Sequence, residues 1–333
     1  MRLAVTHETN YVYEPPVEVA QHMAYLRPRN SAAQQLLNYH LLVEPGPGQQ
    51  VQALDVFGNS RTFISLQMPH ERLRVVACSL VSTQAQEMPE SRIAWEPVRE
   101  RFRYRAEGGY DAAAEFVFAS PYVPRHPDFA AYARQSFVPG ASLFDAACDL
   151  MHRIHTDLAY DSQSTEVNTP ALTALEQRKG VCQDFAHIMI ACLRSLGLAA
   201  RYVSGYLLTR PAPGAQRLLG SDASHAWVSV CLPDLPAPFL WCDFDPTNDR
   251  WGWHAPGEDY VVMAIGRDFA DVSPIRGVIH GGANHRLSVS VTVEPNDPCA
   301  GAVGQDRFQM PNQGQHQSQS QGPVTGSSDV GRP

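Results

Sequence analysis

The sequence predicts an α+β protein, in which strands come first, helices follow and strands then return. Up to about residue 85, short runs of alternating apolar and polar residues are rich in β-branched side chains, and Gly58-Asn59 separates two of them as a hairpin turn. Between residues 142 and 196, apolar residues recur at helical spacing. Beyond residue 200, strand-like runs alternate with breaks rich in Pro and Gly.

These patterns divide the chain into four parts. Residues 1–85 are predicted to form an N-terminal β-sandwich-like domain, and residues 86–140, whose periodicity is weak, a connector. Residues 141–295 are predicted to form the helix-bearing catalytic core and the strands that follow it. Residues 296–333 are dominated by Gln, Gly, Ser and Pro. Such a composition cannot bury a core, so we expect a disordered tail.

The composition narrows the class of partner. The 333 residues are 44% hydrophobic and 18% charged, which is ordinary for a globular protein. A formal net charge of −8 gives no electrostatic reason to expect nucleic acid or an anionic membrane as partner. The N-terminus lacks the apolar segment of a signal peptide, and no apolar run approaches the length of about 18 residues that a membrane span needs. We therefore expect a cytoplasmic protein.

The cysteines fit reduced thiols rather than disulfides or a metal site. Their number is odd, their spacings are scattered and no CxxC pair occurs. No set of Cys and His residues has zinc-ligand spacing, so we expect no metal and no other cofactor. The seven are Cys78, Cys148, Cys182, Cys192, Cys231, Cys242 and Cys299.

Cys182 is the candidate nucleophile. It opens a predicted helix that runs to about Leu196 and directly follows Gly180-Val181. A thiol attacks carbonyl groups as the thiolate, and the N–H groups and positive dipole end of a helix start favour an anion there. The same N–H groups can bind the oxyanion of acyl transfer. Position alone also fits a small buried apolar residue. His187, one turn along, is expected to be structural.

His225 and Asp245 are the candidate partners of that thiol. In the strand-like run 224–230, alternation places His225, Trp227 and Ser229 on one face. Asp245 ends the next run, where its carboxylate can accept the imidazole N–H and fix the tautomer. Asp243, two residues earlier on the same strand face, is the rival for this third role.

Four motifs in this order resemble the bacterial transglutaminase-like family: GVCQDFAH at 180–187, YVSGYL at 202–207, DASHAWVSV at 222–230 and DFDPTND at 243–249. The N-terminal β module and GRDFADVSPIRGV at 266–278 are also similar to parts of these proteins. The resemblance implies a papain-like core, in which a Cys-bearing helix lies on an antiparallel sheet carrying the His and Asp. Matched motif by motif, it implies Cys182 as nucleophile, His225 as base and Asp245 as the third member.

Two positions depart from the family pattern. Ser229 stands where the family often has Glu in HAWVEV, and Tyr260 stands where a His is frequent. We expect neither residue to touch the triad. Trp251 and Trp253 flank Gly252 in a predicted loop after Asp245, where they either border the cleft or anchor the core.

The resemblance implies cysteine-dependent acyl transfer on peptide or protein amides. If water resolves the acyl-enzyme, the protein is a peptidase or amidase; if an amine does, it is a cross-linking transglutaminase. We favour hydrolysis, because a transferase must exclude water and hold an amine, and no motif is typical of an amine site. A catalytically inactive binding or scaffold module is the alternative from another class, against which the intact triad counts. The oligomeric state is left open.

Overall fold

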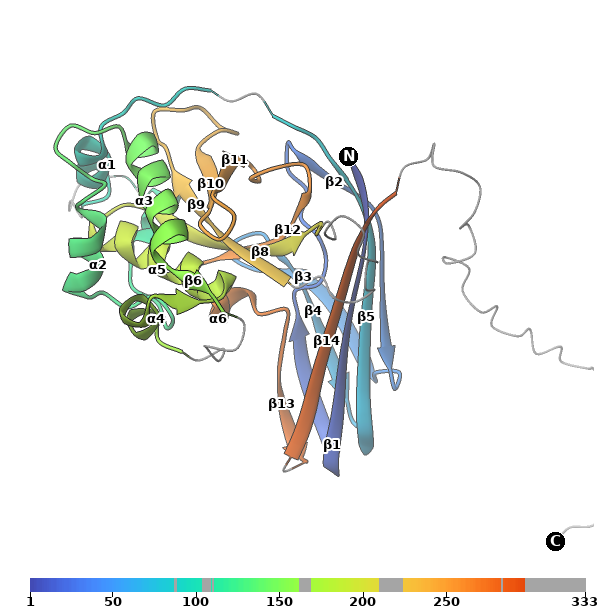
Figure 1. Cartoon of the computed structure of the whole chain (residues 1–333). Coiled ribbons are helices and arrows are strands. Elements are labelled where there is room, and N and C mark those ends of the chain that lie inside the picture. Colours follow the sequence, from blue (N-terminus) through green and yellow to red (C-terminus); the bar gives the residue numbers. More distant parts are fainter. Residues whose placement is uncertain are drawn as a thin grey trace, which may run out of the picture. The chain divides into compact units, whose positions relative to one another are not determined.

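A computed structural model describes residues 1–86, 89–103, 109, 111–161, 169–209, 224–282 and 284–296. Residues 1–297 form one compact unit. It contains two antiparallel sheets and a group of helices, so the predicted α+β class is confirmed (Figure 1). The predicted disordered tail lies outside the described residues, apart from Asn296.

The first sheet is built around one long strand, β1 (Arg2–Ala24). The N-terminal half of β1 lies between β5 and β14, and its C-terminal half lies between β4 and β13. The pairing with β5 is interrupted between Val12 and Val17, where Pro15 and Pro16 supply no backbone N–H. The other strands of this sheet are β2 (Gln34–Glu44), β3 (Gln49–Leu54), β4 (Ser60–Leu66), β5 (His70–Thr83), β13 (Ile275–Gly281) and β14 (Asn284–Pro295).

The last two strands return to the N-terminal sheet. β13 and β14, which were predicted as strands following the catalytic core, both pair with β1. Twelve residues of β14 pair with β1 in unbroken register from Leu3–Pro295 to Glu14–Asn284. Alternation identifies a strand but not its partner, which is why the sequence missed this connection.

The predicted hairpin turn also joins the two sheets. Gly58, with a φ of 75°, lies between β3 and β4 as expected. Asn59 is fully buried and donates from Nδ2 to Asp55 Oδ2 and to the Ile265 carbonyl, each at 2.7 Å. Its Oδ1 accepts from the Ile265 N–H at 2.9 Å. The turn therefore fastens the first sheet to β12 of the second.

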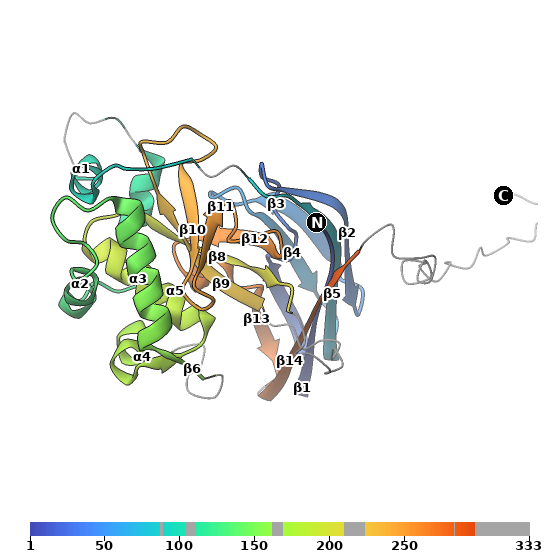
Figure 2. The ribbon, with the colours of Figure 1, turned by 45° about the horizontal axis from the view of Figure 1, so that its top comes forward.

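The second sheet has the strand order β11-β10-β9-β8-β12, and its neighbouring strands are antiparallel. Its helices lie on one face, and the first sheet lies toward the other (Figure 2). Buried side chains of β1, β5 and β14 pack there against β8 and β12. The segment expected to be a loop after Asp245 contains β11, which pairs with β10 and holds Trp251 and Trp253. The strands are β8 (Ala200–Leu207), β9 (Ser224–Cys231), β10 (Trp241–Asp245), β11 (Arg250–Trp253) and β12 (Tyr260–Gly266).

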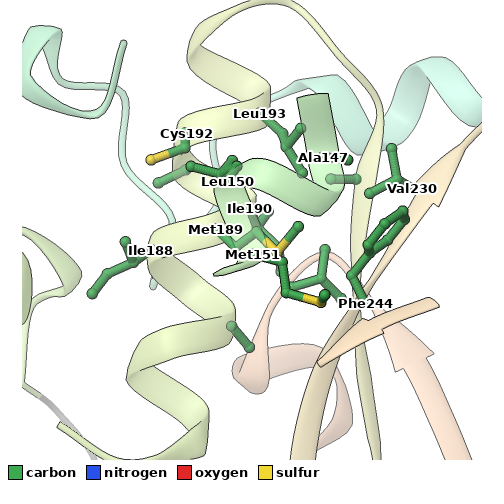
Figure 3. Close-up of a cluster of buried hydrophobic side chains, with 14 of the residues drawn as sticks. Ala147, Leu150, Met151, Ile188, Met189, Ile190, Cys192, Leu193, Val230 and Phe244 are labelled. Atoms are coloured by element: carbon green, nitrogen blue, oxygen red, sulfur yellow. The ribbon is translucent and has the colours of Figure 1, made fainter. Parts of the chain in front are cut away.

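Two predicted helices carry most of the core. The first, α3 (Leu143–Asp157), begins at Ser142, whose Oγ accepts from the Asp145 N–H at 3.3 Å. The second, α5 (Cys182–Ser195), ends before Gly197, whose φ is 82°. Figure 3 shows where they meet the sheet, with these side chains among those in contact: Leu150, Met151, Met189, Ile190, Val230 and Phe244.

The connector folds into short helices against this core. They are α1 (Trp95–Arg101), the 3-10 helix η1 (Ala112–Val117) and α2 (Pro127–Ala133). Buried Arg194 of α5 fastens the segment after η1, because its guanidinium donates to the Phe118 and Ala200 carbonyls at 2.9–3.1 Å. The remaining elements are α4 (Ala171–Gln177), α6 (Phe269–Val272) and a short parallel pair, β6 (Ala159–Tyr160) and β7 (Lys179–Gly180).

Candidate active site

Cys182 is the first residue of α5, as predicted. The residue before it, Val181, is extended, and its N–H donates to Asp184 Oδ2 at 2.9 Å, so an acidic side chain caps the helix start. Gly180 is needed here for space, since a Cβ at that position would lie 2.7 Å from the Asp184 side chain. The Cys182 thiol is left half-buried.

His225 and Asp245 converge on that thiol from neighbouring strands. On β9, His225 lies beside Cys182, which helps to raise the pKa of the imidazole, and its Nε2 forms a 2.7 Å hydrogen bond with Asp245 Oδ2. The Cys182 thiol itself donates to the Ser224 carbonyl at 3.9 Å. Since Nε2 faces Asp245, Nδ1 is the ring nitrogen left for the thiol. The imidazole is 10% exposed and the carboxylate is fully buried. The structure thus brings together the three residues that the motifs singled out, in the order thiol, imidazole, carboxylate.

Several donors surround the Asp245 carboxylate, which stands at the end of β10. Its Oδ1 accepts from the Thr247 N–H at 2.9 Å, in the turn that Pro246 begins. Its Oδ2 accepts from Asn248 Nδ2 and from the Tyr260 hydroxyl, each at 2.7 Å, in addition to His225. Burial alone would raise the pKa of Asp245, but these hydrogen bonds and the positive charge of His225 hold it below its ordinary value.

The same contacts favour the protonated imidazole. Burial alone would lower the pKa of His225, but the hydrogen bond to Asp245 and the neighbouring Cys182 outweigh it and raise this pKa to about 10. An imidazolium beside a thiol is the partner that stabilises a thiolate, and it is also the form that can protonate a leaving amine.

Asp243 does not take the third role. Its carboxylate accepts from Trp227 Nε1 at 2.9 Å, and no hydrogen bond joins it to His225. The Trp227 ring packs edge-on against Tyr260, with centroids 5.4 Å apart. Gly205 lies opposite His225 in the ladder, and a Cβ there would come within 2.4 Å of the Trp227 ring. The glycine of the YVSGYL motif therefore makes room for the tryptophan beside the site.

Two residues of the site were missed in the sequence. Asn248 lies inside the DFDPTND motif but was given no role, although its Nδ2 is 3.3 Å from His225 Nε2. The expectation that Tyr260 does not touch the triad is wrong, because its hydroxyl bonds to Asp245. The signal for Tyr260 was its departure from the family pattern. At the other departure, Ser229, the hydroxyl is buried and forms no hydrogen bond.

Trp251 and Trp253, which were expected either to border the cleft or to anchor the core, pack in the core. Trp251 packs edge-on against Phe144 of α3 with centroids 4.8 Å apart, and Trp253 stacks on the same ring at 5.8 Å. His187 has the structural role that we expected: its ring stacks on Tyr122 at 5.4 Å, and its Nε2 accepts from the Phe269 N–H at 3.3 Å. Burial lowers the pKa of His187 to about 3.

Among the residues that the structure describes, no three or more His, Cys, Asp or Glu side chains are grouped so that they could hold a metal ion. Within the same residues, no helix has the length and apolarity needed to span a bilayer.

Comparison with known proteins agrees with the motifs. Residues 3–82 match the family model of the bacterial transglutaminase-like N-terminal region, and residues 130–246 match that of the transglutaminase-like superfamily. An uncharacterised protein of Mycobacterium tuberculosis (strain ATCC 25618 / H37Rv) is 38% identical over 297 residues, which cover 88% of this chain and 93% of the relative. An uncharacterised protein of Mycobacterium leprae (strain TN) is 31% identical over 298 residues, covering 88% and 98%.

A solved structure shares the fold. It is that of a candidate cysteine protease from Cytophaga hutchinsonii, which is similar with a TM-score of 0.66 and 20% identity over 89% of this chain and 92% of that chain. The likeness extends over both the β-rich part and the core. With the two family models and the mycobacterial relatives, it shows that this chain belongs to the transglutaminase-like superfamily, with a bacterial transglutaminase-like N-terminal region ahead of the core.

Proposed function

We propose that the protein is a cysteine-dependent hydrolase of peptide or protein amides, with Cys182 as nucleophile, His225 as acid and base, and Asp245 as the residue that orients the imidazole. The observation that carries this proposal is the position of His225 beside the Cys182 thiol, with its ring held by a 2.7 Å hydrogen bond to Asp245 on the other side. A buried, structural cysteine requires neither the histidine nor the carboxylate behind it.

The geometry supports a two-step reaction. The Cys182 thiolate attacks the amide carbonyl carbon, a C–S bond forms, and the C=O electron pair moves onto oxygen. As the tetrahedral intermediate collapses, the C–N bond breaks and His225 gives its proton to the leaving amine. A water molecule then loses a proton to His225 and attacks the thioester, which releases the carboxylic acid and the thiolate. Asp245 keeps the imidazole in the tautomer and orientation that both steps need.

The packing of the tryptophans supports hydrolysis over amine transfer. A transferase has to shield its acyl-enzyme from water and hold an acceptor amine, which calls for a walled channel. The tryptophans that were candidates for such walls are Trp227, Trp241, Trp251 and Trp253. Trp227 does lie beside His225, with ring centroids 6.0 Å apart, but Trp251 and Trp253 pack against Phe144 on the helical side of the sheet. Amine transfer by the same triad is the second candidate, and a catalytically inactive binding module is the third.

One experiment separates the three. A glutamine-containing peptide is incubated with the full chain, with and without a millimolar primary amine, and ammonia and products are followed by mass spectrometry. Hydrolysis predicts a glutamate product or a cleaved peptide in both samples. Dominant incorporation of the amine makes the protein a transferase. If neither product forms, and a thiol-reactive amide probe leaves Cys182 unlabelled, the inactive module is correct. Cys182→Ala and His225→Ala are the control variants.

A further inference from the structure

A second polar cluster lies on the sheet face that carries His225, near the other end of the strands. Arg201 of β8 is opposite Ser229 of β9 in the ladder, and Ser229 is opposite Asp243 of β10. The Arg201 guanidinium lies over the Trp241 ring, with its central carbon 4.0 Å from the ring centroid. Gly205, which pairs with His225, is four residues along β8, or roughly 13 Å away. This Arg201 cluster is therefore separate from the catalytic triad.

Burial lowers the pKa of Arg201 and the nearby buried Asp243 carboxylate raises it, but that carboxylate forms no hydrogen bond with the guanidinium. The Arg201 guanidinium forms no hydrogen bond or ion pair with any residue that the structure describes, and its Nε is buried from solvent. Buried Ser229 Oγ beside it also lacks a hydrogen-bond partner. Arg194 shows the contrast, since its guanidinium donates to three carbonyl oxygens and one hydroxyl. Burial of donors without acceptors costs stability, so the Arg201 donors call for an acceptor from outside the chain.

Arg201 lines a cavity that can admit such an acceptor. The cavity has a volume of about 960 Å³ and is open to solvent. Its apolar walls are aromatic, and guanidinium and carboxylate groups stand among them. The aromatic residues that line it are Tyr25, Phe57, Phe116 and Trp241.

Charge favours an anion in this cavity. Every carboxylate that lines it already has a partner from the protein: Asp111 pairs with Arg101, Asp271 and Glu115 pair with Arg267, and Asp55 accepts from Asn59. By contrast, two of the lining guanidinium groups, those of Arg61 and Arg201, have no carboxylate within ion-pair distance among the described residues.

We infer that the Arg201 cluster is a binding site for a carboxylate attached to an apolar body, which is distinct from the catalytic centre. A planar carboxylate can accept two parallel hydrogen bonds from the guanidinium, while Trp241 supports the opposite face of that group. The aromatic walls of the cavity then contact the apolar part of the ligand. A phosphate shares part of this chemistry, and the experiment distinguishes the two.

The first test uses the full chain as Cys182→Ser, so that no reaction at the thiol interferes. Phenylacetate, phenyl phosphate and the neutral phenylethanol are added in separate titrations, followed by melting temperature and by ¹⁹F NMR of 5-fluorotryptophan-labelled protein. At ten times its dissociation constant, a ligand that binds only the folded state raises the melting temperature by roughly 3 °C. We expect this rise with phenylacetate, together with a shift of the Trp241 resonance, assigned through Trp241→Phe.

The outcomes of this test are distinct. A larger effect of phenyl phosphate identifies a phosphate site and overturns the preference for a carboxylate. An equal effect of phenylethanol overturns the anion site itself. The absence of any effect at a ligand concentration of roughly 20 mM, at which weak sites of this size fill, overturns it as well.

Two variants locate the effect. Ser229→Glu places a carboxylate opposite Arg201 in the ladder, within reach of the guanidinium. We expect this variant to lose the response to phenylacetate. Arg201→Met should also lose the response, while Arg134→Met, at an exposed position, should keep it.

A response that survives in Arg201→Met would overturn the proposal. If neither variant folds, the comparison of phenylacetate, phenyl phosphate and phenylethanol still tests the anion site. Alkylation of Cys182 should be unchanged in the variants that retain this residue, which keeps this test independent of the proposed hydrolase activity.

Discussion

The Tyr260 hydroxyl donates a 2.7 Å hydrogen bond to Oδ2 of Asp245, the same oxygen that accepts from His225. Tyr260 begins β12, beyond residues 130–246, which match the superfamily core. The ring is fully buried and packs edge-on against Trp227. The orientation of the proposed triad therefore depends on a strand outside the segment that carries its three members.

Replacing Tyr260 by Phe should lower the turnover of the proposed reaction. The ring and its packing remain, but Asp245 loses a donor, so the carboxylate is held less firmly behind His225. A hydrogen bond to a charged group of this kind corresponds to a loss of roughly tenfold or more in kcat/KM. Peptide hydrolysis by the purified variant measures it. Tyr206→Phe is the matched control, since that buried hydroxyl bonds to His7 at 2.8 Å in the first sheet. If both variants retain full activity, Tyr260 has no positioning role.

Sequence patterns predicted the triad because each member occupies a position that local rules define. Cys182 opens a helix with an apolar stripe, and Asp245 ends a strand at a proline. Alternation also placed Ala226, Val228 and Val230 against the helices, which leaves His225 on the opposite face. Each of these positions follows from the sequence close to the residue. The resemblance to the family indicated that the Cys, His and Asp belong to one site.

Two of the contacts that the sequence did not predict join strands whose partners no local pattern specifies. Tyr260 meets Asp245 because β12 and β10 belong to one sheet, and neither strand pattern specifies its neighbours. The pairing of β14 with β1 spans nearly the whole described chain. β11 was mistaken for a loop because its four residues, including Gly252, are too few for alternation to be recognised.

The pH dependence of hydrolysis should reflect the raised pKa of His225. Because this folded-state pKa lies well above 6.5, the imidazolium persists to alkaline pH and is lost only as the pH rises through about 10. A profile of kcat/KM against pH should therefore keep its activity well above neutral pH. Asp245→Asn removes a hydrogen bond and a charge that raise the pKa, so the alkaline limb should move down by at least one pH unit. Asp243→Asn, on the same strand, should leave the limb in place. A limb near pH 6.5 in the unsubstituted protein would contradict the interpretation.

Cys182 should be alkylated faster than the other cysteines of the folded chain. It alone among the described cysteines has an imidazolium partner, whereas burial raises the pKa of Cys148 to about 12 and that of Cys231 to about 12 as well. Iodoacetamide at neutral pH, followed by peptide mass mapping, gives the rate at each position. His225→Ala should slow the reaction at Cys182 by roughly tenfold or more and leave the others unchanged. Faster labelling of Cys148 or Cys299 would show that the histidine does not activate the thiol.

His22 should make the protein sensitive to acid. It lies in the first sheet against Tyr11, is 4% exposed, and neither ring nitrogen has a hydrogen-bond partner. Burial lowers the pKa of His22 from 6.5 to about 4, with a smaller contribution from His70. Between these values the unfolded chain binds a proton that the folded protein excludes. The free energy of unfolding therefore falls as the pH drops from 6.5 to 4, by about 3 kcal/mol from this one residue.

Replacing His22 by Phe tests this, because the flat ring is kept and the titrating group is removed. At pH 7 the variant should be about as stable as the unsubstituted protein, since His22 is neutral there and forms no hydrogen bond. At pH 4.5 it should be more stable, by roughly 2 kcal/mol. Urea denaturation at both pH values gives the two free energies. His40→Gln, at an exposed position of β2, is the control and should change neither. An equal loss of stability on acidification in the His22→Phe variant and the unsubstituted protein would mean that His22 does not carry the effect, and that other buried groups such as His7, whose pKa burial also lowers to about 4, account for it.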